Sequence, residues 1–270
     1  MTARTPTELE LREDHPRPIG DSLTMAWRNL LNIRRNPQLL VFATIQPVIF
    51  VLMFRYVFGG AINATWNGQP VPYVDFLMPG IFVQTVTFGA LTTGVGLAED
   101  LGKGLIDRFR SLPIARSAVL VGRTWADLVR NVFVVLLMAV VGFLVGWRIN
   151  TNVLGLIGCL LLVLAFAYSL SWVFAIVGLS APDAETAQAA SLPILAPLVF
   201  ASSAFVPVSS MPGWLQVFAK HQPVTAVVDA ARDLTLGGPA RHDVLIALAW
   251  IIGIVAVCAP IAVAKYRRAT

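Results

Sequence analysis

Residues 153–180 read VLGLIGCLLLVLAFAYSLSWVFAIVGLS, a stretch of 28 residues that contains no charged side chain. The hydrocarbon core of a bilayer is about 30 Å thick, and a helix of about 20 apolar residues crosses it. A helix also satisfies its own backbone hydrogen bonds, which lipid cannot do. This stretch therefore predicts a membrane-spanning helix.

Five more apolar runs lie on either side of it, and together they predict six spans. The fifth run contains Pro193 and Pro197, each of which removes a helical hydrogen bond. The predicted spans cover residues 38–58, 76–98, 128–147, 153–180, 190–206 and 244–264. The expected fold is thus an all-α integral membrane protein, with residues 37–270 forming one six-span domain.

The composition of the chain agrees with this fold. It has 270 residues, of which 57% are hydrophobic and 13% charged, which is too apolar for a single soluble core. The net charge of +5 does not indicate nucleic acid, because the basic residues lie in blocks between apolar runs. Cys159 and Cys258 lie in apolar runs and no histidine stands at metal-ligand spacing, so no disulfide or metal site is expected.

Lysine and arginine are divided unequally between alternate connections. Fifteen of the 20 lie before the first span, between the second and third, or after the sixth. The positive-inside rule therefore predicts that both termini and the loop at residues 99–127 are cytoplasmic. Residues 1–20 are polar and lack the apolar segment of a signal peptide, so they predict a retained cytoplasmic tail. The expected location is the cell membrane.

Residues 21–36 have the pattern of an amphipathic helix. Leu23, Trp27 and Leu30 share one face, and Arg28 and Arg35 lie opposite. This pattern favours a helix in the inner membrane interface, although a short soluble helix has the same periodicity.

A second short helix is predicted between the second and third spans. Residues 99–113 read EDLGKGLIDRFRSLP, in which Leu105, Phe109 and Leu112 recur at intervals of four and three. A helix that ends before Pro113 places these apolar side chains on one face, ringed by charges. Such a face suits insertion into a cleft on a partner, or contact with anionic lipid.

Two further connections have recognisable patterns. Residues 182–188, PDAETAQ, predict a tight acidic turn on the inner side between spans four and five. On the outer side, residues 211–218 and 224–236 predict short, half-buried helices that dip toward the membrane.

The sequence offers no catalytic centre. Ser169, Ser171, Ser202 and Ser203 lack a GxSxG turn, and no histidine lies in a span, so these hydroxyls are expected to pack between helices. The stretch at residues 102–104, GKG, lacks the earlier glycine and the following hydroxyl of a Walker phosphate loop. No nucleotide, cofactor or metal is therefore expected on this chain.

Three stretches resemble the integral membrane subunit of type-2 ABC exporters, most closely the daunorubicin-resistance type of permease. They are residues 99–116 with their RFRSLP core, residues 182–188, and residues 205–238 with FVPVSSMPGWLQ. The resemblance implies a separate ATP-binding subunit that holds ATP and magnesium, and a dimer of two copies or of two homologous permeases. Gln222 departs from the pattern, since asparagine is commoner before Pro-Val-Thr.

The same resemblance implies roles for particular segments. Residues 102–112 would be the coupling helix, residues 21–36 the amphipathic helix, and residues 211–236 the re-entrant outer helices. The implied substrate is a hydrophobic or amphiphilic drug, lipid or glycolipid. The expected ATPase-coupling interface comprises Glu99, Asp100, Lys103, Leu105, Asp107, Arg108, Phe109, Arg110, Leu112 and Pro113, and the second cytoplasmic turn adds Asp183, Glu185 and Gln188. Candidate substrate-path residues are Gln46, Gln84, Phe82, Phe200 and Phe205, of which the aromatics could equally pack or face lipid.

Two other function classes remain open from the residues alone. A membrane enzyme that modifies lipid would need paired carboxylates near one membrane face, for which the pairs at residues 99–100 and 183–185 are candidates. A stand-alone channel or ion-driven carrier normally places ionisable groups near the midplane. The predicted spans offer only neutral groups there, such as Gln46 and Gln84.

Overall fold

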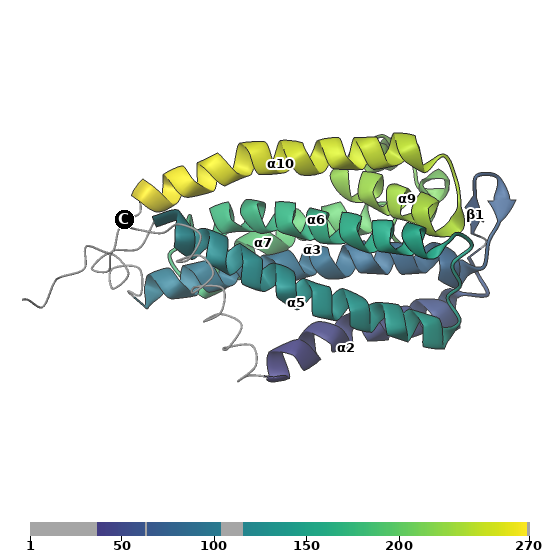
Figure 1. Cartoon of the computed structure of the whole chain (residues 1–270), viewed down its shortest axis with the longest axis horizontal. Helices are drawn as coiled ribbons and strands as arrows, with labels where there is room; N and C mark the ends of the chain where they lie inside the picture. Colours follow the sequence, from purple (N-terminus) through teal and green to yellow (C-terminus); the bar gives the residue numbers. More distant parts are fainter. Residues whose placement is uncertain (1–36, 63, 104–115, 269–270) are drawn as a thin grey trace, which may run out of the picture.

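The computed structural model describes residues 37–62, 64–103 and 116–268, and helices dominate this part of the chain (Figure 1). The predicted interface helix at residues 21–36 lies outside it, as do residues 104–113 of the predicted coupling interface. The described elements are α2 (Pro37–Met53), the π-helix η1 (Phe54–Phe58), β1 (Thr65–Trp66), β2 (Gln69–Pro70), α3 (Tyr73–Gly102), α5 (Arg116–Val145), α6 (Val153–Gly178), α7 (Ala184–Phe200), the 3-10 helix η2 (Val208–Ser210), α8 (Gly213–Lys220), α9 (Pro223–Leu236) and α10 (Ala240–Arg268).

Four helices in the described residues are long and apolar enough to cross a membrane: Tyr73–Gly102, Leu120–Val145, Val153–Gly178 and Ala240–Arg267. They correspond to the second, third, fourth and sixth predicted spans, which confirms a helical membrane protein. The first predicted span coincides with a shorter apolar helix, Ala43–Phe58, and the fifth with the 17 residues of α7. Six crossings therefore stay a prediction.

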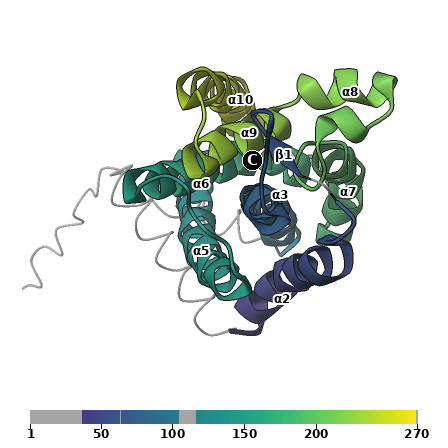
Figure 2. The ribbon, with the colours of Figure 1, turned by 90° about the vertical axis from the view of Figure 1, so that its right-hand side faces the viewer.

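Helix α3 lies in the middle of the bundle. Figure 2 shows it surrounded by α2, α5, α6, α7 and α9. In α3, 72% of the most apolar window is buried, compared with 11% in α10. Apolar helices therefore serve two purposes here, since α3 forms the protein core and α10 offers an apolar surface.

The bundle has two ends, and polar contacts hold the segments together at each of them. At one, here called the coupling end (residues 94–103, 116–127, 176–190 and 258–268), Arg123 Nη1 lies 2.6 Å from Asp100 Oδ2, and Lys265 Nζ contacts Ser180 Oγ. At the other, the hairpin end (residues 59–76, 145–155 and 200–243), the Arg148 backbone N–H donates to Asp75 Oδ1 at 2.8 Å. Figure 1 shows these as the left and right ends of the molecule.

Helices α3 and α6 approach closely through glycine. A Cβ atom added at Gly178 would lie 2.1 Å from the Gly94 carbonyl oxygen, and one added at Gly94 would lie 2.5 Å from the Phe174 carbonyl oxygen. Small residues allow the backbones of membrane helices to meet in this way. The packing of α6 against α3 therefore depends on the absence of a Cβ atom at Gly94 and Gly178.

Replacing Gly178 by alanine should destabilise the protein by about 1–3 kcal/mol, because the added methyl group forces the two backbones apart. Thermal unfolding of the purified protein, followed by tryptophan fluorescence, measures the effect. The matched control is Gly253→Ala in α10, where an added Cβ meets nothing within 4 Å. Equal unfolding temperatures for the two variants would contradict the close approach.

The structure corrects two predicted connections. The loop expected at residues 99–127 is helical wherever it is described, because α3 continues to Gly102 and α5 begins at Arg116. Hydropathy placed the end of α3 too early and the start of α5 too late, because Asp100 and Arg123, which bond to each other between the two helices, resemble loop residues. Residues 182–188 do not form a turn throughout, since α7 begins at Ala184. The Asp183 carboxylate instead accepts a hydrogen bond from the Thr186 backbone N–H at 2.7 Å and caps the helix.

A two-stranded hairpin at the hairpin end was not predicted. Thr65 pairs with Pro70 and Trp66 with Gln69. Asn67 and Gly68 form the turn with φ of 50° and 75°, the left-handed values of a type I′ turn. The Asn-Gly pair is the sequence signal for this turn, but only two residues pair on each side.

Candidate coupling and outer sites

The predicted coupling residues that the structure describes lie at the end of α3. Lys103 and Glu99 form an ion pair of 2.5 Å within the helix, and both side chains are more than half exposed. Asp100 instead bonds to Arg123 of α5, and these two side chains are only 17–20% exposed. Glu99 and Lys103 are therefore free to meet a partner surface, whereas Asp100 joins two helices.

The central part of the predicted coupling interface lies outside the described residues, so its helix stays a prediction. Its two flanks are described: α3 ends at Gly102 and α5 begins at Arg116, and both flanks lie at the coupling end. The residues outside are Leu105, Asp107, Arg108, Phe109, Arg110, Leu112 and Pro113.

The second predicted stretch lies at the same end. Asp183, Glu185 and Gln188 are exposed at the start of α7, just after α6 ends beside Gly94 of α3. The Thr186 backbone hydrogen bond stabilises the ionised carboxylate and lowers the pKa of Asp183. The structure thus places the described residues of both predicted coupling stretches at one end, with exposed charged groups on each and the amide of Gln188 on the second.

At the hairpin end, the chain between α7 and α8 is irregular but mostly buried. Ser202, Ser203 and Ala204 are at most 3% exposed, although residues 201–206 belong to no helix or strand. Buried backbone groups require hydrogen-bond partners. Here side chains supply them: Gln222 Nε2 donates to the Leu198 carbonyl oxygen at 2.9 Å, and the Tyr73 hydroxyl donates to that of Phe205 at 3.0 Å.

Arg232 of α9 is the centre of this arrangement and is completely buried. Its Nη2 atom donates to the carbonyl oxygens of Ser203 at 2.6 Å and Ala204 at 3.2 Å, and its Nε atom donates to that of Phe76 at 2.9 Å. Its Nη1 atom pairs with Asp229 at 3.2 Å. One guanidinium therefore joins α9, the start of α3 and residues 201–206.

Sequence reasoning missed Arg232 as a site residue, although it lies in the stretch at residues 205–238 that carries the resemblance. The available signal was an acidic and a basic residue three positions apart, Asp229 and Arg232, in a helix whose other residues include the apolar run at residues 226–228 and a second carboxylate, Asp233. A charged pair in such a helix is unusual unless both groups find buried partners.

Two of the predicted substrate-path residues meet in an aromatic cluster. The ring centroids of Phe200 and Phe205 are 5.8 Å apart, and Phe205 stacks on Phe54 at 4.8 Å. Phe50 and Phe58 extend the stack along α2 and η1. This phenylalanine cluster (Phe50, Phe54, Phe58, Phe200 and Phe205) connects the first apolar helix to the end of α7. Its first three members repeat every four residues, a signal that sequence reasoning did not use.

The other three path residues lie apart from that cluster. Phe82 is fully buried and packs edge-on against Trp147 at 5.3 Å, and Gln84 is 1% exposed in the centre of α3. Gln46 is exposed on α2. The five residues are therefore not brought together within one chain, and their role in transport stays a prediction.

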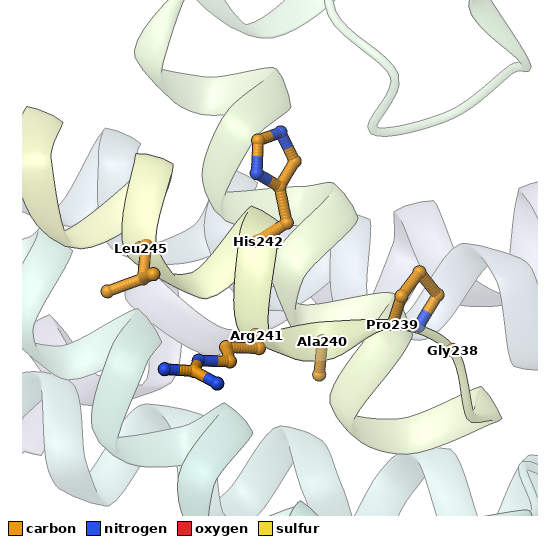
Figure 3. Close-up of a pocket in the computed structure, with 6 residues that line it drawn as sticks. All are labelled: Gly238, Pro239, Ala240, Arg241, His242 and Leu245. Atoms are coloured by element: carbon orange, nitrogen blue, oxygen red, sulfur yellow. The ribbon is translucent and has the colours of Figure 1, made fainter.

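A hollow opens at the surface where α10 begins (Figure 3). Its lining residues are Gly238, Pro239, Ala240, Arg241, His242 and Leu245. None of them belongs to either predicted site, so the hollow gives the transport path no support. Within residues 37–62, 64–103 and 116–268, no three His, Cys, Asp or Glu side chains form a group that could hold a metal ion.

Comparisons with known proteins give the family. The sequence model described as "ABC-2 type transporter" matches residues 22–236. The daunorubicin resistance ABC transporter permease protein DrrB1 of Streptomyces coeruleorubidus is 35% identical over 250 residues, which are 93% of this chain and 87% of that protein.

A second relative is the "Probable doxorubicin resistance ABC transporter permease protein DrrC" of Mycobacterium tuberculosis, 27% identical over 93% of this chain and 90% of that one. Both comparisons run through the coupling end and the hairpin end alike. The chain therefore belongs to the ABC-2 type transporter family, as a membrane permease.

Proposed function

We propose that this permease exports a hydrophobic or amphiphilic compound, such as a drug, lipid or glycolipid. The observation that carries the proposal is the 35% identity, along 93% of the chain, to a permease named for daunorubicin resistance. The apolar character of the bundle supports it, because a compound that partitions into lipid can reach such a surface from the bilayer.

The energy would come from a separate ATP-binding subunit. This chain has no Walker phosphate loop, so it needs a partner that hydrolyses ATP with magnesium. The coupling end suits that partner, because Glu99, Lys103 and the start of α7 expose polar groups there. We assign the partner's contact to this end and to the sequence at residues 105–113.

We further propose that this permease crosses the cell membrane six times and that both of its termini lie in the cytoplasm. In favour of this, α2 and η1 together form 22 continuous residues, Pro37–Phe58, enough for about 30 Å of helix. Helix α7 is shorter, and residues 201–206 extend it toward the hairpin end. The positive-inside rule favours the coupling end as the inner one, because most basic residues of the sequence lie before the first predicted span, between the second and third, or after the sixth.

The working unit would be a dimer, of two copies or of this chain with a homologous permease. Helix α3 fills the middle of the bundle with buried side chains such as Phe82. A substrate path is therefore better placed between two permeases, with lipid around them, than through the centre of one.

Transport into inside-out vesicles tests this function. The permease is co-expressed with its ATP-binding subunit, and the uptake of daunorubicin is compared with and without ATP. We expect uptake that needs ATP and disappears when the Walker lysine of the ATP-binding subunit is replaced. ATP-dependent uptake that persists in vesicles lacking the permease would contradict the proposal. So would the absence of ATP-dependent uptake for all three of daunorubicin, a lipid analogue and a glycolipid.

A further inference from the structure

Charged and polar residues line one face of α5 inside a helix that is otherwise apolar enough to cross the membrane. Arg123, Asp127 and Arg130 are spaced at four and three residues, so they share a face. All three lie within the apolar helix Leu120–Val145. In the count of basic residues, Arg123 and Arg130 belong to the connection between the second and third spans, although Arg130 lies within the predicted span at residues 128–147.

Each of these side chains has its partner on α3, which runs in the opposite direction. Nearest the coupling end, Arg123 Nη1 lies 2.6 Å from Asp100 Oδ2. Further in, the Thr93 hydroxyl donates to Asp127 Oδ2 at 2.5 Å.

Deeper still, Arg130 Nη2 donates to the Gly89 carbonyl oxygen at 2.6 Å and lies 3.8 Å from Asp127 Oδ1. These contacts form three rungs over residues 89–100 of α3, a length of about 16 Å. We call them the α3–α5 ladder.

Glycines on α3 make room for the larger α5 side chains. A Cβ atom at Gly96 would lie 1.5 Å from Arg123 Nη2, and one at Gly89 would lie 2.6 Å from Asn131 Oδ1. The α3 surface therefore has room for these side chains at Gly89 and Gly96, and a shift of one helix along the other would bring them against larger residues.

The burial of the ladder argues against a role in carrying ions. Thr93 is fully buried and Asp127 is 8% exposed. Charges in a membrane span are costly unless they are paired with each other or with backbone carbonyls, and both kinds of pairing are present here. Groups held by several partners at once suit a fixed connection better than a relay that must release them.

The two helices that the ladder joins are those on either side of residues 104–115. Helix α3 leads into that segment and α5 leads out of it, and α3 continues into the middle of the bundle. A force applied at the coupling end therefore acts on both helices. Because the ladder opposes sliding of α3 along α5, the two helices move together.

We propose that the α3–α5 ladder makes these two helices a single rigid lever, and that Asp100, Arg123 and Asp127 are positioning residues that transmit ATP-driven motion into the transport path. This inference rests on the proposed function, because it concerns how the permease receives work from its ATP-binding subunit. Without the ladder, the partner would still hydrolyse ATP, but less of its motion would reach the permease core.

The ratio of substrate transported to ATP hydrolysed tests the lever. The permease is reconstituted with its ATP-binding subunit in proteoliposomes, after Cys159 and Cys258 are replaced by alanine. With Asp100→Cys and Arg123→Cys together, the outermost rung is lost, and we expect a fall of about tenfold or more in daunorubicin transported per ATP. A short bifunctional thiol reagent that bridges the two cysteines should restore the ratio, because it replaces the rung by a covalent link.

A matched control is Arg241→Ala, which removes an exposed arginine at the start of α10, at the hairpin end, and no contact between α3 and α5. Its ratio should equal that of the parent protein. Arg123→Asp combined with Asp100→Arg, which reverses the pair, should retain more coupling than either single change.

Three results would overturn the lever. Transport and hydrolysis could fall in proportion to the amount of folded protein, which would mean that the ladder only stabilises the fold. The bridged double-cysteine protein could be inactive, which would mean that α3 and α5 must slide. The ratio could also stay unchanged. Failure of the proposed function is a separate outcome, because the parent complex would then show no ATP-driven transport before any substitution.

Discussion

Replacing Arg232 by alanine should leave almost no correctly folded permease. The guanidinium is completely buried, and its loss removes a donor from the carbonyl oxygens of Phe76 and Ser203 and the charged partner of Asp229, which keeps the hydrogen bond from the Ser203 hydroxyl. Removing one partner of a buried ion pair costs about 3–5 kcal/mol, and each unsatisfied buried acceptor adds about 1–3 kcal/mol. Since whole domains are stable by only about 5–15 kcal/mol, the change should unfold the hairpin end.

The yield of monodisperse protein in size-exclusion chromatography and the unfolding temperature measure this effect. Arg232→Lys should fail as well, because one ammonium group cannot reach acceptors on three segments. The matched control is Arg241→Ala, which removes an exposed arginine at the start of α10 and should leave the yield unchanged. A stable Arg232→Ala protein would contradict the arrangement described for residues 201–206.

Replacing Phe109 by aspartate should abolish coupling to the ATP-binding subunit and leave membrane insertion intact. Phe109 lies outside the described residues, and its spacing with Leu105 and Leu112 predicts that it stands on the apolar face of a helix. An aromatic side chain at the centre of a protein interface often contributes about 2 kcal/mol or more, which corresponds to at least about a thirtyfold loss of affinity. A carboxylate would also lose its hydration on entering the same cleft.

Co-purification with the ATP-binding subunit and its ATPase rate in the complex measure the loss. Phe109→Leu keeps an apolar side chain and is the control, with coupling expected near that of the unaltered protein. If Phe109→Asp assembled and hydrolysed ATP at the normal rate, the proposed interface at residues 105–113 would be wrong.

The spans were largely predictable from sequence, and their limits were not. Residues 153–180 have no charge and no proline, so both hydropathy and length point to the helix that the structure contains at Val153–Gly178. For α5, hydropathy placed the beginning about twelve residues too late, because Arg123 and Asp127 resemble loop residues when their partners are unknown. The charges within one segment of the sequence do not reveal that side chains of another helix pair with them.

The hairpin end was the least predictable part. Residues 201–206 continue an apolar run and were taken as part of a fifth span over residues 190–206. Their backbone leaves the helix because Arg232, Gln222 and Tyr73 supply hydrogen bonds from segments that are distant in sequence. Pro193 and Pro197 signalled an interruption, but α7 continues through both and ends only at Phe200.

The coupling end was predictable in its chemistry but not in its connections. The sequence indicated exposed polar groups at Glu99, Lys103 and Asp183, and the structure confirms that all three are exposed. Asp100 was expected to face a partner, yet it bonds to Arg123. Spacing along one helix shows which residues share a face, but not which face another helix covers.

The permease is proposed to depend on a separate ATP-binding subunit for its energy. ATP hydrolysis and transport by the purified components test this dependence directly. The permease alone in proteoliposomes should neither hydrolyse ATP nor move daunorubicin. Adding the ATP-binding subunit should produce both activities together, in proportion to the complex formed. Sustained hydrolysis or active transport by the permease in the absence of that subunit would contradict the account.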